Sequence, residues 1–309
     1  MKKLVLIIAT IASTLGANAQ QDAMFTHYSF NTLGVNPAYA GSRDALTVLG
    51  LHRSQWVSFP GAPITQTVTA HMPIVNDKMG VGLSLLHDKI GPTRNMGFFV
   101  DFAYRIRVGD KGKLAFGIKG GTSMLANELA DLSTTDGGDN TFAQNIQSQF
   151  LPNFGAGVYY QLPRFYVGLS TPRLLENDYQ SNTTAGSVAS EARHYFLIAG
   201  GMIDLTKDAK VQLKPTTFVK LTAGAPIEVD LTALFYFNQK FWAGPMFRTG
   251  DAFGVLAGLN INPQFSLGYS FDWSYGLNTG KYNAGSHELM LRYDFVFRDK
   301  GKILSPRYF

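Results

Sequence analysis

Apolar and polar residues alternate along most of the chain after residue 44, in segments of about ten residues. In residues 96–107 one set of alternate positions is apolar and comprises Met96, Phe98, Val100, Phe102, Tyr104 and Ile106. The other set comprises Gly97, Phe99, Asp101, Ala103, Arg105 and Arg107. Successive side chains of a strand point to opposite faces, so this segment would have one apolar and one mostly polar face. A helical period would mix the two sets, and the pattern therefore predicts a β-strand.

The same alternation recurs in about fourteen segments. They start near residues 45, 64, 79, 95, 113, 152, 165, 194, 210, 227, 241, 252, 265 and 287. The segments are long for a soluble β-sandwich or propeller, whose outward faces would also be polar. That alternative remains open, but an apolar outward face is typical of strands that face lipid.

The connections between these segments alternate in length. Short links with turn-forming residues lie at 76–77, 109–112, 162–163, 207–208, 238–239 and 262–263. Longer links occupy 54–63, 88–94, 126–149, 173–193 and 275–286, and two exceptions around Gly224 and Gly250 are short. Bacterial barrels have an even strand number, short periplasmic turns and longer outer loops. The sequence therefore predicts an all-β, transmembrane antiparallel β-barrel of about 14 strands over residues 45–297, with both termini in the periplasm.

Composition fits this prediction. The chain has 23 Phe, 14 Tyr and 32 Gly, but only 16% charged residues and no cysteine. A soluble domain of this size would carry more charge, and a helical membrane protein would show runs of about 20 apolar residues. In a lipid-embedded barrel only alternate residues need be apolar. Without cysteine, disulfides and thiolate metal sites are excluded.

The first 19 residues resemble a secretory signal peptide. Lys2 and Lys3 precede an apolar run from Leu4 to Leu15, and Ala17-Asn18-Ala19 supplies a small-x-small cleavage pattern before Gln20. The alternative, a membrane anchor, needs a longer run to span about 30 Å of hydrocarbon. Removal of residues 1–19 would take away two lysines and leave a net charge of +3. No basic cluster indicates a nucleic-acid partner. We expect the protein to lie in the outer membrane of a Gram-negative bacterium, in contact with the membrane lipid.

The less apolar strand faces carry charges of both signs. The candidate lumen charges are Asp101, Arg105, Lys220, Glu228, Asp272, Arg292 and Asp294. A tight turn near Gly224 would bring Lys220 opposite Glu228. Lipid-facing charge costs roughly 2–4 kcal/mol at the bilayer midplane, so these side chains should face the barrel interior. The mixture of signs favours a charge-balanced lining over a selectivity ring.

Residues suited to catalysis are scattered. The six histidines form no H-E-x-x-H or similar metal pattern. Ser286 and His287 are adjacent, but neighbouring strand residues point to opposite faces, so a nucleophile–base pair between them is disfavoured. We therefore expect no enzymatic activity, no catalytic residue, no metal and no cofactor.

Two stretches carry a family resemblance. Residues 21–42 contain Asn36-Pro37-Ala38-Tyr39-Ala40-Gly41-Ser42, preceded by Phe25-Thr26-His27-Tyr28 and Asn31. A second stretch contains Arg53-Ser54-Gln55-Trp56 and then Phe59-Pro60-Gly61-Ala62-Pro63, and the chain ends Ser305-Pro306-Arg307-Tyr308-Phe309. Together these motifs resemble the PorP/SprF family of the type IX secretion system, found in Bacteroidota. The family-motif residues are Phe25, Tyr28, Asn31, Asn36, Pro37, Ala38, Tyr39, Gly41, Arg53, Gln55, Trp56, Pro60 and Gly61.

The motif residues also have structural roles. Pro37 favours an extended Asn36, and Gly41 and Gly61 permit tight bends. Tyr39 and Trp56 suit the membrane–water boundary. We expect residues 20–44 to form a periplasmic or plug-like segment that lies inside or against the periplasmic mouth and is not a strand. The basic tail, residues 298–309, should be periplasmic, either solvated or docking a partner.

The resemblance implies a binding function. Family members help to export or anchor large cell-surface proteins, such as gliding adhesins, through the C-terminal sorting domain of the cargo. Some work with periplasmic peptidoglycan-binding or other secretion-system proteins. Two alternatives stay open: a porin or small-solute transporter, and an outer-membrane lipid enzyme. Neither the export or anchoring function nor the porin function requires catalytic residues.

Overall fold

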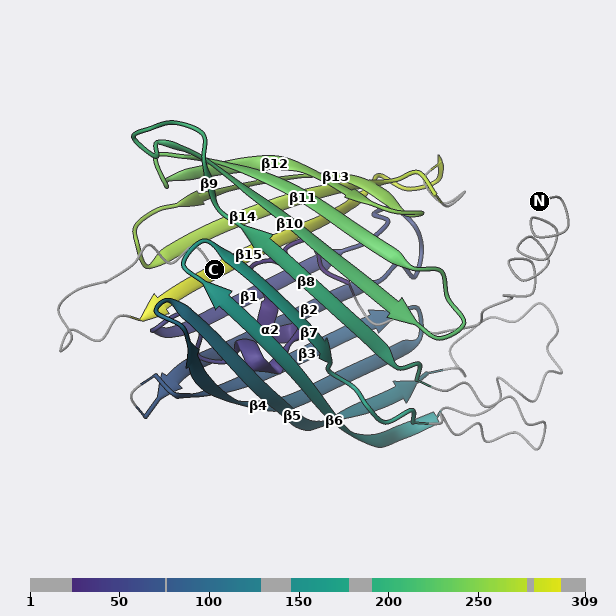
Figure 1. Cartoon of the computed structure of the whole chain (residues 1–309). Helices are drawn as coiled ribbons and strands as arrows, with labels where there is room; N and C mark the ends of the chain where they lie inside the picture. Colours follow the sequence, from purple (N-terminus) through teal and green to yellow (C-terminus); the bar gives the residue numbers. More distant parts are fainter. Residues whose placement is uncertain (1–23, 76, 129–145, 178–190, 277–280, 296–309) are drawn as a thin grey trace, which may run out of the picture.

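The computed structural model describes residues 24–75, 77–128, 146–177, 191–276 and 281–295, which form an antiparallel β-barrel around a short internal segment (Figure 1). The strands are β1 (Leu46–Ser54), β2 (Ile64–Ile74), β3 (Met79–Ile90), β4 (Thr93–Val108), β5 (Gly112–Asn127), β6 (Ile146–Leu162), β7 (Phe165–Thr171), β8 (His194–Gly201), β9 (Ile203–Asp204), β10 (Val211–Thr222), β11 (Glu228–Phe237), β12 (Phe241–Arg248), β13 (Ala252–Asn260), β14 (Phe265–Ser274) and β15 (Ser286–Phe295).

Each strand pairs with its neighbour in sequence, and the wall is closed. β15 pairs with β1, Leu46 opposite Phe295, and β10 pairs with both β8 and β11. The two-residue β9 continues β8 beyond Met202, so the wall has the fourteen strands that the alternation predicts. Closure leaves no unpaired sheet edge, which a structure surrounded by lipid requires.

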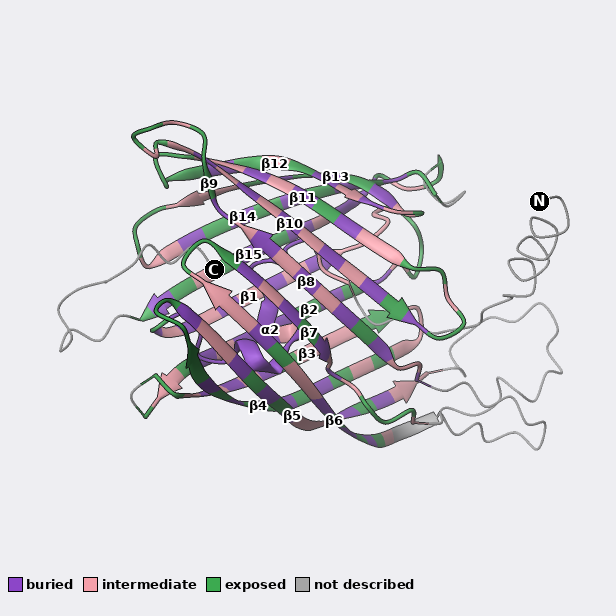
Figure 2. Ribbon diagram, in the orientation of Figure 1, coloured by how far each residue is buried: buried purple, intermediate pink, exposed green. Residues whose placement is uncertain are grey.

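The two faces of the wall separate as the alternation predicts. On β4 the outward side chains Phe98 and Val100 are 48% and 49% exposed, whereas Asp101 and Ala103 are fully buried. Figure 2 shows this alternation of exposed and buried residues along the strands. Bare apolar side chains cover the outside, so this surface is suited to lipid. Within the described part of the chain, no helix is long and apolar enough to cross a membrane.

The two ends of the barrel differ. One, here called the turn end, carries the links at residues 109–111, 163–164, 205–210, 238–240 and 261–264, and β1 begins and β15 ends there. The other, the loop end, carries the links at 55–63 and 275–285 and the long connections whose central residues lie outside the described part. The strands beside the longest connection extend further than expected, because β5 continues to Asn127 and β6 begins at Ile146.

The described residues that precede β1 lie inside the barrel (Figure 1). Residues 24–45, here called the plug segment, contain α2 (Thr32–Val35) and the 3₁₀ helix η1 (Pro37–Tyr39), and none of them belongs to a strand. Pro37 begins η1 and the preceding Asn36 is extended, at φ −138° and ψ 111°. Gly41 makes the bend after η1 with φ +70°. The described core is therefore built between the plug segment and the inward faces of the strands.

Candidate functional site

The plug segment begins near the loop end, where it joins a buried network of charged side chains. Arg53 Nη1 donates to Asp272 Oδ2 at 2.8 Å, to Glu288 Oε2 at 3.2 Å and to Thr26 Oγ1 at 2.7 Å. Glu288 also accepts the backbone N–H groups of Thr26 and His27, both at 2.8 Å. The His27 ring lies 2.7 Å from Glu288 Oε1 through Nδ1. Strands β1, β14 and β15 thus fix the start of the plug segment.

The middle of the plug segment packs against both sides of the lumen. Tyr28 stacks on Phe218 with ring centroids 5.0 Å apart, and its hydroxyl lies 2.9 Å from Thr232 Oγ1. Burial raises the pKa of Tyr28 well above its ordinary value, and the nearby Asp230 raises it further. On the opposite side Asn31 Oδ1 accepts from Thr69 Oγ1 at 3.0 Å. Tyr28 therefore stays a neutral hydrogen-bonding group.

The Asn-Pro-Ala-Tyr motif lies against glycines of β5, β6 and β7. The Asn36 side chain accepts from Ala38 N at 3.0 Å and donates to the carbonyls of Val158 and Leu169 at 3.1 and 3.4 Å. A Cβ atom at Gly117 would lie 2.1 Å from Ala38 N, and one at Gly157 would lie 2.2 Å from Asn36 Oδ1. Only glycine leaves room for this close approach of the motif to the wall.

The plug segment ends at the turn end. Arg43 Nη2 donates to Asp294 Oδ2 at 2.9 Å, and Thr47 Oγ1 donates to Asp294 Oδ1 at 2.7 Å. Arg105 donates to the carbonyl oxygen of Ala40, and Gly41 N donates to His71 Nδ1 at 3.0 Å. The segment therefore runs from the loop end to the turn end. Its first residues, Thr26 and His27, find their buried partners near the loop end, and Arg43 finds its partner at the turn end.

The other predicted site residues are distributed along the lumen and the loop end. Asp101 pairs with Lys119 at 3.0 Å, and the strand register places Lys220 opposite Glu228. Gln55, Trp56, Pro60 and Gly61 lie in the β1–β2 link at the loop end, where Gly61 has φ +74°. Phe25 is half-buried at the start of the plug segment.

The structure contradicts one expectation about the motif aromatics. Tyr39 does not lie at the membrane boundary; it is 3% exposed inside the barrel, edge-on to Tyr159 with ring centroids 5.5 Å apart. The lumen supplies both the apolar surface and the polar groups that an amphipathic ring requires.

The long-range partners of several site residues carry no recognisable signal in the sequence. Thr26 and His27 meet Glu288, and Arg43 meets Asp294, across separations of 251 to 262 residues. Neither periodicity nor spacing relates such distant positions. Asp294 was expected in the lumen, but its partner in the plug segment was not.

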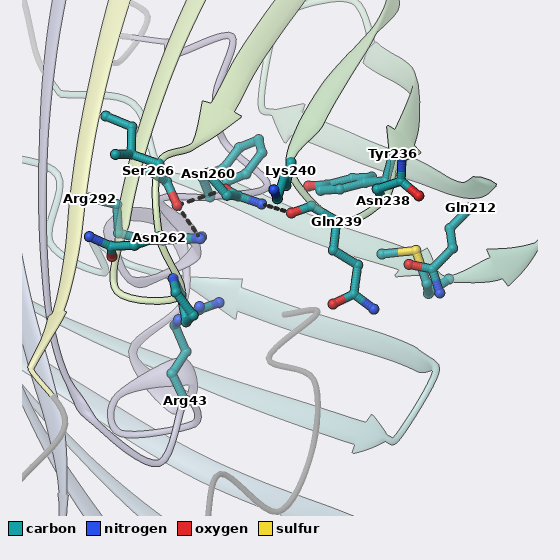
Figure 3. A pocket seen from close by; sticks show the side chains of 14 residues that line it. Arg43, Gln212, Tyr236, Asn238, Gln239, Lys240, Asn260, Asn262, Ser266 and Arg292 are labelled. Carbon is teal, nitrogen blue, oxygen red and sulfur yellow. Dashed lines mark hydrogen bonds between the residues drawn. The ribbon is translucent and has the colours of Figure 1, made fainter. Parts of the chain in front are cut away.

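A cavity of about 500 Å³ remains between the plug segment and the wall at the turn end (Figure 3). Its cationic lining residues are Arg43, Lys240 and Arg292, and the described lining includes no Asp or Glu. Its amide-bearing lining residues are Gln212, Asn238, Gln239, Asn260 and Asn262. Arg292 Nη2 donates to Ser266 Oγ at 3.0 Å, and Ser266 Oγ donates to Asn260 Oδ1 at 2.8 Å. The cavity is thus a polar, cationic space beside the end of the plug segment.

A closed fourteen-strand barrel with an apolar outer surface and an occupied lumen defines an outer-membrane-type β-barrel protein. The sequence matches the family described as "Type IX secretion system membrane protein PorP/SprF" over residues 17–293. The chain therefore belongs to the PorP/SprF family, as the motifs predicted. Membership places it among the membrane proteins of a secretion system, which implies partners within that system, rather than in an enzyme family. An outer-membrane location fits both the family and the fold.

Solved structures share the barrel architecture. The CymD monoaromatic hydrocarbon channel is similar with a TM-score of 0.52 and 10% identity, covering 86% of this chain and 93% of that one. The outer membrane protein Omp33 of Acinetobacter baumannii is similar with a TM-score of 0.46 and 12% identity, covering 82% and 98%. At such identities the likeness concerns the fold alone. No curated protein matched the sequence.

Proposed function

We propose that this protein binds a large exported cell-surface protein through the cargo's C-terminal sorting domain, and helps to export or anchor it. The observation that carries the proposal is the plug segment of a PorP/SprF barrel, which is fixed inside the lumen at both ends. A lumen filled by the chain's own residues supports a role in holding a protein rather than in passing solutes. Binding of this kind requires no catalytic group.

The loop end is the surface that we assign to the cargo. Bacterial barrels direct their longer loops outward and their short turns to the periplasm. The long connections, the β1–β2 link with Trp56 and the β14–β15 link all lie at the loop end. Trp56 N donates to Ser286 Oγ at 3.2 Å, and Val57 N donates to the carbonyl of Gly285 at 2.9 Å, so these two links support one another. Family motif residues thereby shape the outer rim.

Affinity purification from native membranes tests the proposal. A tagged barrel should retain a large exported protein with a C-terminal sorting domain, and deletion of the gene should leave that protein unexported. A variant that lacks residues 129–145 should lose cargo while the barrel still reaches the membrane. Removal of Lys207 by Lys207→Gln, at an exposed turn-end position, is the matched control and should retain cargo. Recovery of the wild-type barrel alone would contradict the proposal.

A further inference from the structure

Positive charge is balanced differently toward the two ends of the lumen. Toward the loop end Arg53 meets Asp272 and Glu288, and Arg248 meets Asp230 at 2.9 Å. At the turn end, by contrast, two arginines share one carboxylate. Arg43 lies 2.9 Å from Asp294, and Arg292 lies 4.0 Å from the same oxygen.

The excess of positive charge lines the cavity at the turn end. Lys240 adds a third positive charge at its rim, and no Asp or Glu is among the described residues that line it. The side chain of Arg43 is 4% exposed and that of Arg292 is 12% exposed, so both charges sit in a space largely withdrawn from water. Such a place raises the local concentration of anions.

The hydrogen-bonding groups around the cavity are suited to a carboxylate. Arg292 donates to Ser266 through Nη2, while its Nε is buried and makes no hydrogen bond with any described residue. Its guanidinium lies 5.7 Å from the centre of the Phe30 ring. Asn238 and Gln239 contribute amide side chains from the turn between β11 and β12 (Figure 3). Arginine with its planar donors recognises carboxylates, and amides pair with a peptide backbone.

We propose that this cavity binds carboxylate groups that reach it from the turn end, supplied by an acidic protein segment or by a free dicarboxylate. Arg292 would hold one carboxylate inside the cavity, and Lys240 would hold a second at its rim. The site goes beyond the proposed cargo-binding function, which concerns the opposite end of the barrel, and does not depend on it. Under the predicted orientation, a carboxylate-bearing ligand on the periplasmic side would engage the protein here.

Isothermal titration calorimetry on the full chain in detergent tests the site. The probes are an acetylated and amidated tetraglutamate peptide, its tetraglutamine counterpart and glutarate. Tetraglutamate should bind saturably and more weakly at high salt, and tetraglutamine should not bind. Arg292→Gln should weaken binding by about tenfold or more, because a buried charge-assisted contact is lost. Lys240→Gln should weaken it by about threefold because that lysine is exposed.

Two further variants separate charge from folding. Arg292→Lys keeps the charge but loses the planar donors, so it should bind more weakly than wild type and more tightly than Arg292→Gln. Lys207→Gln removes an exposed turn-end charge outside the cavity and should change nothing. Tighter binding of tetraglutamate than of glutarate supports an acidic protein segment, and equal binding supports a free dicarboxylate. Equal affinity in wild type and Arg292→Gln, or no saturable binding of either anion, would overturn the proposal. Arg292→Gln should still retain cargo in the affinity purification. A failure of the carboxylate site can therefore be distinguished from a failure of the proposed cargo-binding function.

Discussion

Individual buried charges in the barrel depend on their partners. Arg53 is held by Asp272 and Glu288, and its side chain is 2% exposed, while those of the two acids are 1% and 0% exposed. Removing one partner from a buried ion pair leaves an uncompensated charge, which costs more than the net contribution of the intact pair. Arg53 is also the family-motif residue that contacts the plug segment, through Thr26. Its role is therefore tied to the attachment of this segment.

We predict that Arg53→Met lowers the free energy of unfolding by about 3–5 kcal/mol, because Asp272 and Glu288 lose their shared cation. Urea unfolding in lipid vesicles, followed by tryptophan fluorescence, measures this change. The control is Arg94→Met, since Arg94 and Glu128 form a pair whose side chains are 47% and 41% exposed. That variant should change stability by less than about 1 kcal/mol. Equal changes in the free energy of unfolding for the two variants would contradict a stabilising role of the buried Arg53 ion pairs.

At the scale of elements, β5 shows how a strand serves two environments. Phe116 and Ile118 point outward and are 49% and 63% exposed, whereas Gly117 faces η1 inside the barrel. The glycine is required by the plug segment and not by the strand itself, which glycine weakens. Gly117 therefore lowers the β-propensity of β5 but leaves room for the Pro37-Ala38 backbone.

Adding one methyl group tests this packing. Gly117→Ala should lower the free energy of unfolding by about 1–3 kcal/mol, because its Cβ would meet the backbone of Pro37 and Ala38. It should also increase hydrogen exchange at residues 36–42. Gly120→Ala on the same strand is the control, since its Cβ would meet only Phe154 at 3.7 Å, an ordinary contact. Equal hydrogen exchange of residues 36–42 in the two variants would show that the plug segment does not pack there.

At the scale of the whole molecule, the plug segment decides what the barrel can transmit. It is fixed at the loop end through Glu288 and at the turn end through Asp294. The lumen between these points holds the two buried hydrophobic clusters. An open diffusion channel would require a continuous aqueous path past them.

We therefore predict that the wild-type protein conducts little current in planar lipid bilayers, and that deletion of residues 24–43 produces stable, larger conductance steps. The intact barrel with the double substitution Lys207→Gln and Lys210→Gln controls for altered surface charge at the turn end and should resemble wild type. Large, steady conductance of the wild-type protein would favour the porin alternative instead.

The direction of the plug segment has a second consequence. Thr26 lies with Arg53 near the loop end, and under the predicted orientation this end faces the outside of the cell. Because the chain has no cysteine, a cysteine inserted before Met24 would be the sole target of an impermeant maleimide. It should be labelled on intact cells, whereas Asp110→Cys, in the turn between β4 and β5, should be labelled only after the outer membrane is opened. The reverse pattern would place the loop end in the periplasm.

The sequence alone determined the wall of this protein. Alternation of side chains is a local property, so Phe98, Asp101 and their neighbours reveal which face is apolar, and turn residues reveal where strands end. Fourteen strands and the inward direction of the candidate lumen charges followed from such signals, and the family followed from the motifs between residues 21 and 63. The pairing of Lys220 with Glu228 also followed, since a tight turn brings the two together.

Only the tertiary structure decided what occupies the lumen. The plug segment has no periodicity, and its contacts join residues far apart, such as Asn36 with Val158 and Thr26 with Asp272, separated by 122 and 246 positions. Its path is set by the shape and charge of a wall that exists only after closure. For the same reason, the cavity around Arg292 combines the plug segment with turns from distant strands and could not be read from neighbouring residues.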